Sequence, residues 1–190
     1  MFGINQDDLD YIFESAGQNV LVNGNPMNAI ITNPPLGEYE EKYIHSRQNV
    51  SRGDMVTLEG EQYLCFTESI TRRGGKYKNR IRHCNFNVKV TLPGEEVYVG
   101  DDPFTDEPVY EYLPGEVVEI PSFLETKSYS VTSGVWVTSN NEILVTMRDV
   151  AERRSIFELD DTFEVMGKTW RITNILLDKK GLITVNCERR

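Results

Sequence analysis

A sequence pattern that occurs twice constrains this chain most. Residues 54–65 read DMVTLEGEQYLC, and residues 161–172 read DTFEVMGKTWRI. Both segments place an Asp six residues before a Gly and an aromatic residue three residues after that Gly. Apolar and polar residues alternate on both sides of the Gly, which is typical of a β-hairpin with one buried face. The repeat therefore predicts two related β modules.

Other strand-like segments and turn signals fill most of the remaining chain. Asn23-Gly24 is a strong signal for a turn between two strands. One short helix is expected near the N-terminus, where Asn5 can cap it and Gly17 can end it. Trp136 and Trp170 stand among apolar neighbours, which favours positions in the core. We expect an all-β, mostly antiparallel fold with two small β modules and a short N-terminal helix.

Charge and proline content divide the chain into three parts. Residues 92–127 hold ten acidic residues and one Lys, together with five of the eight prolines. Residues 71–90 instead hold seven Lys or Arg and no acidic residue. We place the helix and the first β module at residues 1–91 and the second module at residues 129–190. Residues 92–128 form an acidic, Pro-rich linker or arm between them.

Composition excludes several classes of protein. The net charge of −10 argues against general nucleic-acid binding, because that affinity comes mostly from neutralising phosphates. Residues 1–17 lack the basic start and apolar stretch of a signal peptide, and no run is long enough to cross a membrane. The three Cys are widely spaced, which favours buried thiols in a reducing compartment over disulfides or a zinc site.

Candidate catalytic and metal-binding residues do not form a set. His45 and His83 lack carboxylates at metal-ligand spacing. Asp101-Asp102 and Asp160-Asp161 lack the ligand spacing of a calcium loop. Residues 72–76 resemble a phosphate-binding loop in composition only, since the required Gly-Lys spacing is missing. We expect no enzymatic activity, no metal and no cofactor.

Several of these segments resemble head–tail connector or head-closure proteins of tailed phages that infect Gram-positive bacteria. The resemblance covers residues 17–90 and 129–190. In the first half it is carried by Arg52-Gly53-Asp54-Met55-Val56, Tyr63-Leu64-Cys65, Tyr77-Lys78 and Ile81-Arg82-His83-Cys84-Asn85. In the second half it is carried by residues 143–146, 157–163, 170–174 and 181–183.

The resemblance implies a non-enzymatic structural protein of the virion neck, made in the host bacterial cytoplasm. Such a protein forms a homo-oligomeric ring between the portal or adaptor protein and the tail terminator or tail tube. It closes the DNA exit channel, through which genomic DNA passes without sequence-specific binding. An acidic channel wall would repel DNA and keep it from sticking.

Two charged segments are the candidate functional residues. Neighbouring copies that pair a basic surface with an acidic one would set the register of a ring. Two solvated faces would show the same composition. The basic segment is expected to be a mobile loop at an interface or in the channel, with Arg72, Arg73, Gly74, Gly75, Lys76 and Lys78. The acidic subunit interface consists of Glu95, Glu96, Asp101 and Asp102.

Two alternative functions stay open at this point. The basic segment with Tyr77 and Phe86 interleaved also fits a β-barrel that binds single-stranded nucleic acid, because aromatic residues stack on bases while cations follow the backbone. A tail-side adaptor or terminator is the other alternative. Binding of single-stranded DNA that weakens with salt would favour the first of them.

Overall fold

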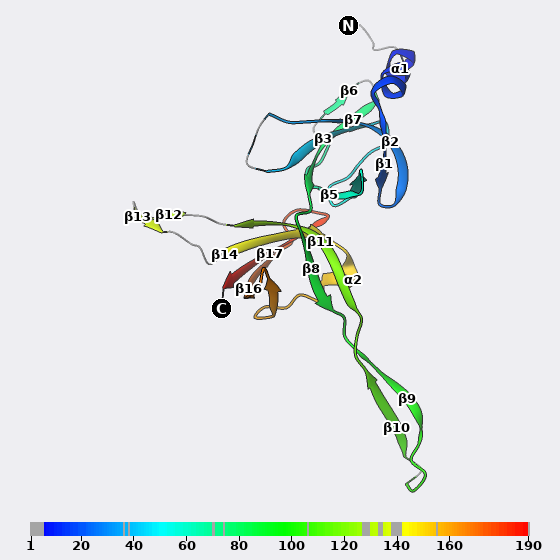
Figure 1. The fold of residues 1–190 in the computed structure, drawn as a ribbon, viewed down its shortest axis with the longest axis vertical. Coiled ribbons are helices and arrows are strands. Elements are labelled where there is room, and N and C mark those ends of the chain that lie inside the picture. The colour runs from blue at the N-terminus through cyan, green and yellow to red at the C-terminus, as the bar shows by residue number, and fades with distance from the viewer. Residues whose placement is uncertain are drawn as a thin grey trace.

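The computed structural model describes residues 6–35, 37, 39–69, 71–73, 75–105, 107–126, 130–132, 135–137, 142–154 and 156–189. Every strand pairing in it is antiparallel. Helix α1 (Gln6–Ala16) precedes the strands, as the sequence predicts, while its expected cap Asn5 lies outside the described residues. The predicted all-β fold is thus confirmed (Figure 1).

The first sheet closes into a six-stranded barrel. Its order is β3-β2-β1-β4-β5-β7, and β3 also pairs with β7. The strands are β1 (Gln18–Val22), β2 (Asn25–Thr32), β3 (Glu41–Ser46), β4 (Met55–Leu58), β5 (Glu61–Cys65) and β7 (Lys76–His83), with β6 (Thr71–Arg73) added beside β7. Alternate residues fill its core, namely Val20, Val22, Ala29, Ile44, Val50, Val56, Leu58, Tyr63, Cys65 and Ile81.

The second sheet repeats this strand order with one difference. Its order is β15-β16-β17-β14-β11-β8, which matches β4-β5-β7-β3-β2-β1 of the first barrel. The strands are β8 (Phe86–Thr91), β11 (Val117–Thr126), β14 (Glu142–Arg148), β15 (Thr162–Val165), β16 (Lys168–Leu176) and β17 (Leu182–Arg189). The first barrel joins β1 to β4, whereas β8 and β15 come within 8 Å between Cα atoms but do not pair. We call this gap the seam.

The two repeated sequence segments form matching hairpins, as predicted. β4 and β5 are joined by Glu59-Gly60, with φ angles of 53° and 87°. β15 and β16 are joined by Met166-Gly167, with φ angles of 51° and 70°. Positive φ at both turn residues is the two-residue turn that suits the twist of antiparallel strands, and Gly favours it at the second position.

The repeated Asp has the same structural role in each copy. The Asp54 carboxylate accepts a hydrogen bond from the Ser51 backbone N–H at 2.7 Å, and the Asp161 carboxylate accepts one from Glu158 at 2.9 Å. The carbonyl of each Asp also accepts the backbone N–H eleven residues later, Cys65 at 2.9 Å and Ile172 at 2.8 Å. The pattern therefore encodes a tight turn that leads into a hairpin.

The acidic segment is a long arm inserted into the second barrel. β9 (Glu95–Asp101) and β10 (Pro108–Leu113) pair with each other and extend the β8–β11 ribbon far beyond the body (Figure 1). The first sheet ends with β7 at His83, and the second sheet begins with β8 at Phe86. From composition alone, the acidic segment separates two modules. In the structure, β8 and β11 on either side of it pair within one sheet.

A smaller hairpin and a second helix complete the described elements. β12 (Ser130–Thr132) pairs with β13 (Val135–Val137), and α2 (Ala151–Arg154) follows β14. Trp170 is 7% exposed and belongs to the core of the second barrel, as predicted. Trp136 lies on β13, and its side chain is outside the described residues. The rest of that core is Val88, Ile120, Ile143, Val145, Met147, Phe157, Val165, Ile172, Ile183, Val185 and Cys187.

Side chains from both barrels pack together at the junction. Leu64 of the first barrel and Phe123 and Leu182 of the second form a separate buried cluster. Asn85, between β7 and β8, exchanges two hydrogen bonds with the Leu124 backbone at 2.8 and 3.3 Å. Arg148 donates to the Asn23 side chain at 2.9 Å. Polar and apolar contacts therefore fix one barrel against the other.

Candidate assembly interface

The arm exposes apolar side chains on both of its strands. Tyr98 and Tyr110 contact each other across the strands with ring centroids 5.9 Å apart, and both remain more than half exposed. A two-stranded hairpin with no sheet behind it is marginally stable in water. The arm therefore has the composition of a surface that another polypeptide covers. Its exposed apolar residues are Val97, Tyr98, Val99, Phe104, Val109, Tyr110, Tyr112 and Leu113.

The four predicted acidic interface residues all lie on this arm, in two different settings. Asp101 accepts a hydrogen bond from the Tyr98 hydroxyl at 2.7 Å, and this bond and, to a smaller extent, burial raise the pKa of Tyr98. Asp102 accepts bonds from the backbone of Phe104 and Thr105 at 2.8 and 3.3 Å, which shapes the tip of the arm. Glu95 and Glu96 are exposed and have no partner among the described residues. They are the acids that remain free for a partner.

The described backbone of the basic segment forms strands on both sides of a turn, and the expected mobility of this loop stays a prediction. Arg72 and Arg73 belong to β6 and pair with Tyr77 and Lys76 of β7. Gly75 makes the turn with a φ of 76°, and the side chains of residues 71–73 and all of Gly74 lie outside the described residues. The backbone of β6 is held by β7, which sequence reasoning missed because a three-residue strand gives almost no pattern.

Lys76 and Lys78 form an unpaired basic face with Tyr43 and His45. Neither Lys has a carboxylate partner among the described residues, and Lys78 Nζ lies 3.9 Å from the Tyr43 ring centroid. Burial lowers the pKa of His45, and the charges of Lys78 and Lys76 lower it further. The basic face of β3 and β7 is therefore a cationic surface beside a neutral His.

Arg80 and Arg82 on the same strand do not contribute free charge. Both form ion pairs with Glu41, and Arg82 also pairs with Glu125 of the second barrel. The predicted basic segment thus divides into a free part at Lys76 and Lys78 and a structural part at the junction. This division could not be predicted from the sequence, because it depends on which carboxylates the fold places beside each basic side chain.

The basic face and the acidic arm lie at opposite ends of the molecule (Figure 1). They cannot meet within one chain. Contact between them requires a second copy, with the arm of one subunit on the basic face of another.

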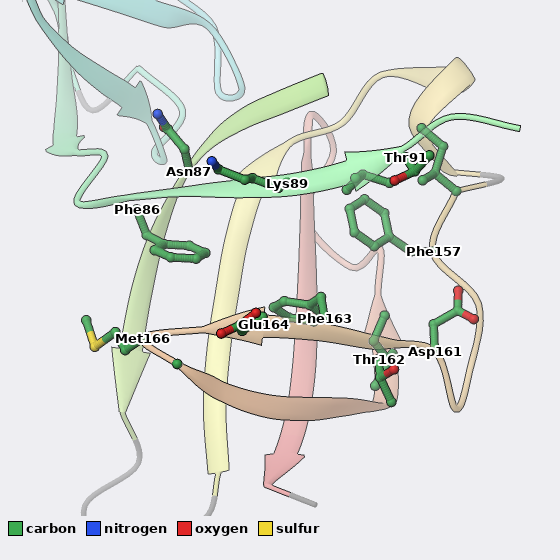
Figure 2. Close-up of a pocket in the computed structure, with 14 residues that line it drawn as sticks. Phe86, Asn87, Lys89, Thr91, Phe157, Asp161, Thr162, Phe163, Glu164 and Met166 are labelled. Atoms are coloured by element: carbon green, nitrogen blue, oxygen red, sulfur yellow. The ribbon is translucent and has the colours of Figure 1, made fainter. Parts of the chain in front are cut away.

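The seam is the third surface, and sequence reasoning missed it. A groove of about 640 Å³ lies between β8 and the β15–β16 hairpin. Figure 2 shows Phe86, Phe157 and Phe163 in this space, with Lys89 on the β8 side and Glu164 on the β15 side. Only the pairing of strands places these residues together, because Phe86 and Phe163 are far apart in the sequence.

The His and Cys residues have structural surroundings. His45 Nε2 lies 3.0 Å from the Thr32 hydroxyl, and His83 lies 3.0 Å from carboxylates of Glu40 and Glu61. Across the described ranges no group of three His, Cys, Asp or Glu side chains is placed to hold a metal ion. The three thiols are free, and burial raises the pKa of each to about 12, namely Cys65, Cys84 and Cys187. In the same part of the chain no helix has both the length and the apolar character needed to span a bilayer.

The fold and these surfaces define a protein of two tandem, related β-barrels with one projecting arm. The chain belongs to the YomX family: the YomX N-terminal domain matches residues 1–83 and the YomX C-terminal domain matches residues 77–188. The two matches overlap on β7, so the second begins just before β8, where the second barrel starts. Membership in this family associates the protein with bacteriophages. Comparison with curated proteins and with solved structures found no match.

Proposed function

We propose that this protein is a non-enzymatic structural protein of the phage virion neck. It forms a homo-oligomeric ring that joins the portal or adaptor side of the head to the tail terminator or tail tube and closes the DNA exit channel. The phage association of the family and the resemblance to head-closure proteins support this location. The exposed arm supports assembly with other copies.

The single observation that carries the proposal is the exposed apolar arm, which projects from two barrels that are packed against each other. Strands β9 and β10 expose Tyr, Phe, Val and Leu side chains that a monomer would leave in water. Tyr and Phe are enriched at the centres of protein interfaces, where they bury a large area with few rotatable bonds. Contact with a neighbouring copy would stabilise the arm and attach that copy to the two barrels that carry it.

Charge supplies the direction of assembly. Among the described residues, Glu95 and Glu96 at the base of the arm have no ion-pair partner, and Lys76 and Lys78 on the basic face have no carboxylate partner. A contact between these two different surfaces is heterologous, and a heterologous contact repeated with a suitable rotation closes a ring. Opposite charges also raise the rate of encounter and disfavour wrong registers.

A charge-exchange experiment tests the assembly. The double variant Glu95→Lys/Glu96→Lys and the double variant Lys76→Glu/Lys78→Glu should each block ring formation in mass measurements, alone or on a portal ring. Combining all four changes in one chain should restore it. Glu14→Lys/Glu59→Lys changes the net charge of the chain as the first variant does, at exposed sites elsewhere, and should assemble normally.

The virion location has its own test. In a phage that carries Glu95→Lys/Glu96→Lys, filled heads and separate tails should accumulate, and DNA should leak from the heads. Joined, infectious particles from this phage would overturn the charge-pairing mechanism. Absence of the protein from purified virions would overturn the neck location itself. A tail-side adaptor or terminator would instead copurify with tails in a mutant that cannot join them.

One observation favours the nucleic-acid alternative. Lys76, Lys78 and Tyr43 place cations beside an aromatic ring, as surfaces for single-stranded nucleic acid do. Lys78 already covers one face of Tyr43, at 3.9 Å, so a base could stack only after it moves. Salt-dependent binding of single-stranded DNA that disappears in Lys76→Gln/Lys78→Gln would favour this alternative.

A further inference from the structure

The seam is a property of the second barrel and not of the shared fold. Both barrels have the same strand order, and the first one is closed at this point by the pairing of β1 with β4. Phe163 of β15 occupies the place of Val56 in the repeated hairpin. Val56 is completely buried, whereas the larger Phe163 is half-buried and lines the groove. The larger side chain therefore lies where the two edge strands of the second barrel are not paired.

The groove has the make-up of a site for one large apolar side chain. Phe86, Phe163 and Phe157 line it, together with the half-buried Val90 and Ile156. Its volume of about 640 Å³ lies within the range of ordinary binding pockets. The unpaired edges of β8 and β15 add free backbone donors and acceptors beside these rings. A peptide segment with an aromatic residue fits this chemistry.

The tip of the arm displays such a residue. Phe104 is 95% exposed, the highest value among the exposed large apolar residues of the described chain. The Asp102 carboxylate binds the backbone N–H groups of Phe104 and Thr105, and the Asp102 N–H donates to the Glu107 carbonyl at 2.8 Å. These bonds fix the backbone at Phe104 and Thr105, which reduces the entropy that is lost when Phe104 binds.

From these features we infer that Phe104 of one copy docks in the seam of a second copy. The arm points away from its own barrel, so it cannot fill its own seam (Figure 1). Each subunit offers one tip and one groove, which is the arrangement that a heterologous ring requires. Lys89 on the β8 side is held only by an exposed ion pair to Glu119 at 3.2 Å. In this contact Lys89 would attract the acidic tip and Glu164 on the opposite side would repel it, which would set the orientation of the tip.

This inference rests on the proposed assembly into a ring and specifies its contact. Disulfide trapping tests it directly. One copy carries Phe104→Cys, and a second copy, distinguished by a tag, carries Met166→Cys on the groove, where Met166 is 79% exposed. The native thiols Cys65, Cys84 and Cys187 are present in every pair tested, so they cannot account for a difference between this pair and its control.

The expected result is a covalent dimer of the tagged copy with the untagged copy under mild oxidation. The control pairs Phe104→Cys with Tyr11→Cys. Tyr11 is 71% exposed and belongs to α1, and this helix lies at the far end of the molecule from the arm (Figure 1). This pair should crosslink far less. In parallel, Phe104→Ser should weaken self-association tenfold or more, as truncation of an interface anchor does, and Phe104→Leu should retain most of it. Tyr11→Ser should leave it unchanged.

Each outcome separates the two proposals. Rings of normal mass that show no crosslink between positions 104 and 166 would overturn the seam contact and leave the ring standing. Equal crosslinking at positions 11 and 166, or unchanged association of Phe104→Ser, would overturn it as well. A chain that stays monomeric both alone and on a portal ring would overturn the seam contact and the proposed function together.

Discussion

Gly53 and Gly181 lie against each other where the two barrels join. A Cβ atom on Gly53 would come within 2.2 Å of the Gly181 carbonyl oxygen, and one on Gly181 would come equally close to the Arg52 carbonyl oxygen, at 2.2 Å. Both residues have positive φ, of 92° and 88°. The Arg52 side chain also donates to the Lys180 carbonyl at 2.8 Å. Backbone therefore meets backbone here, and no side chain can move aside to make room.

Gly53→Ala should destabilise the protein more than Gly60→Ala does. Gly60 has a similar φ of 87° but faces open space, so its replacement costs only the left-handed strain of about 1–2 kcal/mol. At Gly53 the added methyl group also collides with Gly181, and overpacking of this kind costs roughly 1–3 kcal/mol more. Chemical denaturation of both variants measures the difference. Equal losses of unfolding free energy in the two variants would mean that the backbone at the junction moves to accept the methyl group without an energetic cost.

Arg82 joins the barrels through charge and aromatic contacts. Its side chain is 13% exposed and forms ion pairs with Glu41, at 2.6 Å, and with Glu125. Its guanidinium carbon lies 4.8 Å from the ring centroid of Phe66 and 4.6 Å from that of Phe123. Arg82→Ala leaves a buried carboxylate with one partner fewer and should cost about 3–5 kcal/mol in the free energy of unfolding. Arg82→Lys keeps the charge but loses the planar fork, so it should fall between wild type and Arg82→Ala.

A double-mutant cycle separates the contact between barrels from the rest. Glu125→Gln removes the charge on the second barrel only. If Arg82 and Glu125 stabilise the junction together, the losses in Arg82→Ala and Glu125→Gln should not add. Strict additivity would contradict a direct contribution of this pair.

Local pattern was enough to predict the hairpins but not the junction. The Asp, the Gly and the alternating apolar residues each act within about ten positions, so residues 54–65 and 161–172 are readable from the sequence. Gly53 and Gly181 touch only because two turns in different barrels meet. The same limit hid the pairing of Arg82 with Glu125, because sequence spacing does not reveal contacts between modules.

Trp170→Ala should destabilise the second barrel by roughly 3–5 kcal/mol, as expected when a large buried aromatic side chain is removed. Trp170 is 7% exposed, and its Nε1 donates to the Val165 carbonyl across the hairpin at 3.4 Å. Tyr63 occupies the same place in the first hairpin and is 8% exposed, so Tyr63→Ala is the matched variant. Urea denaturation checks both. A loss under about 1 kcal/mol for Trp170→Ala would contradict its place in the core.

His45 should reduce stability as the pH falls. Its pKa is lowered in the folded state by burial and then by Lys78 and Lys76, so below the ordinary value of 6.5 the unfolded chain takes up the proton first. Stability is therefore unaffected above that value, falls as the pH drops below it, and stops falling once the pH passes the folded pKa. His45→Gln should remove this loss. In an NMR titration Lys78→Gln should raise the His45 pKa, and an unchanged pKa would show that Lys78 does not act on it.

The acidic arm could be predicted as a charged, Pro-rich segment, but its position in the fold could not. Composition marks residues 92–127 as different, yet the strands on either side of the arm pair only in three dimensions. The seam was hidden for a related reason. Its rings come from β8, from β15 and from the loop before β15, and each strand alone has the ordinary alternation of a half-buried strand.

Removing the arm should leave the two-barrel body folded and abolish assembly. The Leu92 N–H donates to the Glu116 carbonyl at 2.9 Å, so these two residues close the ribbon just before the arm begins. In the first barrel the equivalent strands β1 and β2 are joined by Asn23-Gly24, with φ angles of 50° and 80°. Replacing residues 93–115 with Asn-Gly copies that turn and fits the strand twist.

The free energy of unfolding of the armless chain should lie within about 1 kcal/mol of that of the full chain, because the deletion removes exposed surface and none of the core. Mass measurement should find it monomeric where the full chain forms rings. Its own seam stays intact, however, so a peptide that spans residues 100–109 should still bind it, and the same peptide with Ser at position 104 should not. An armless chain that still forms rings of the original size would show that the arm does not hold the subunits together.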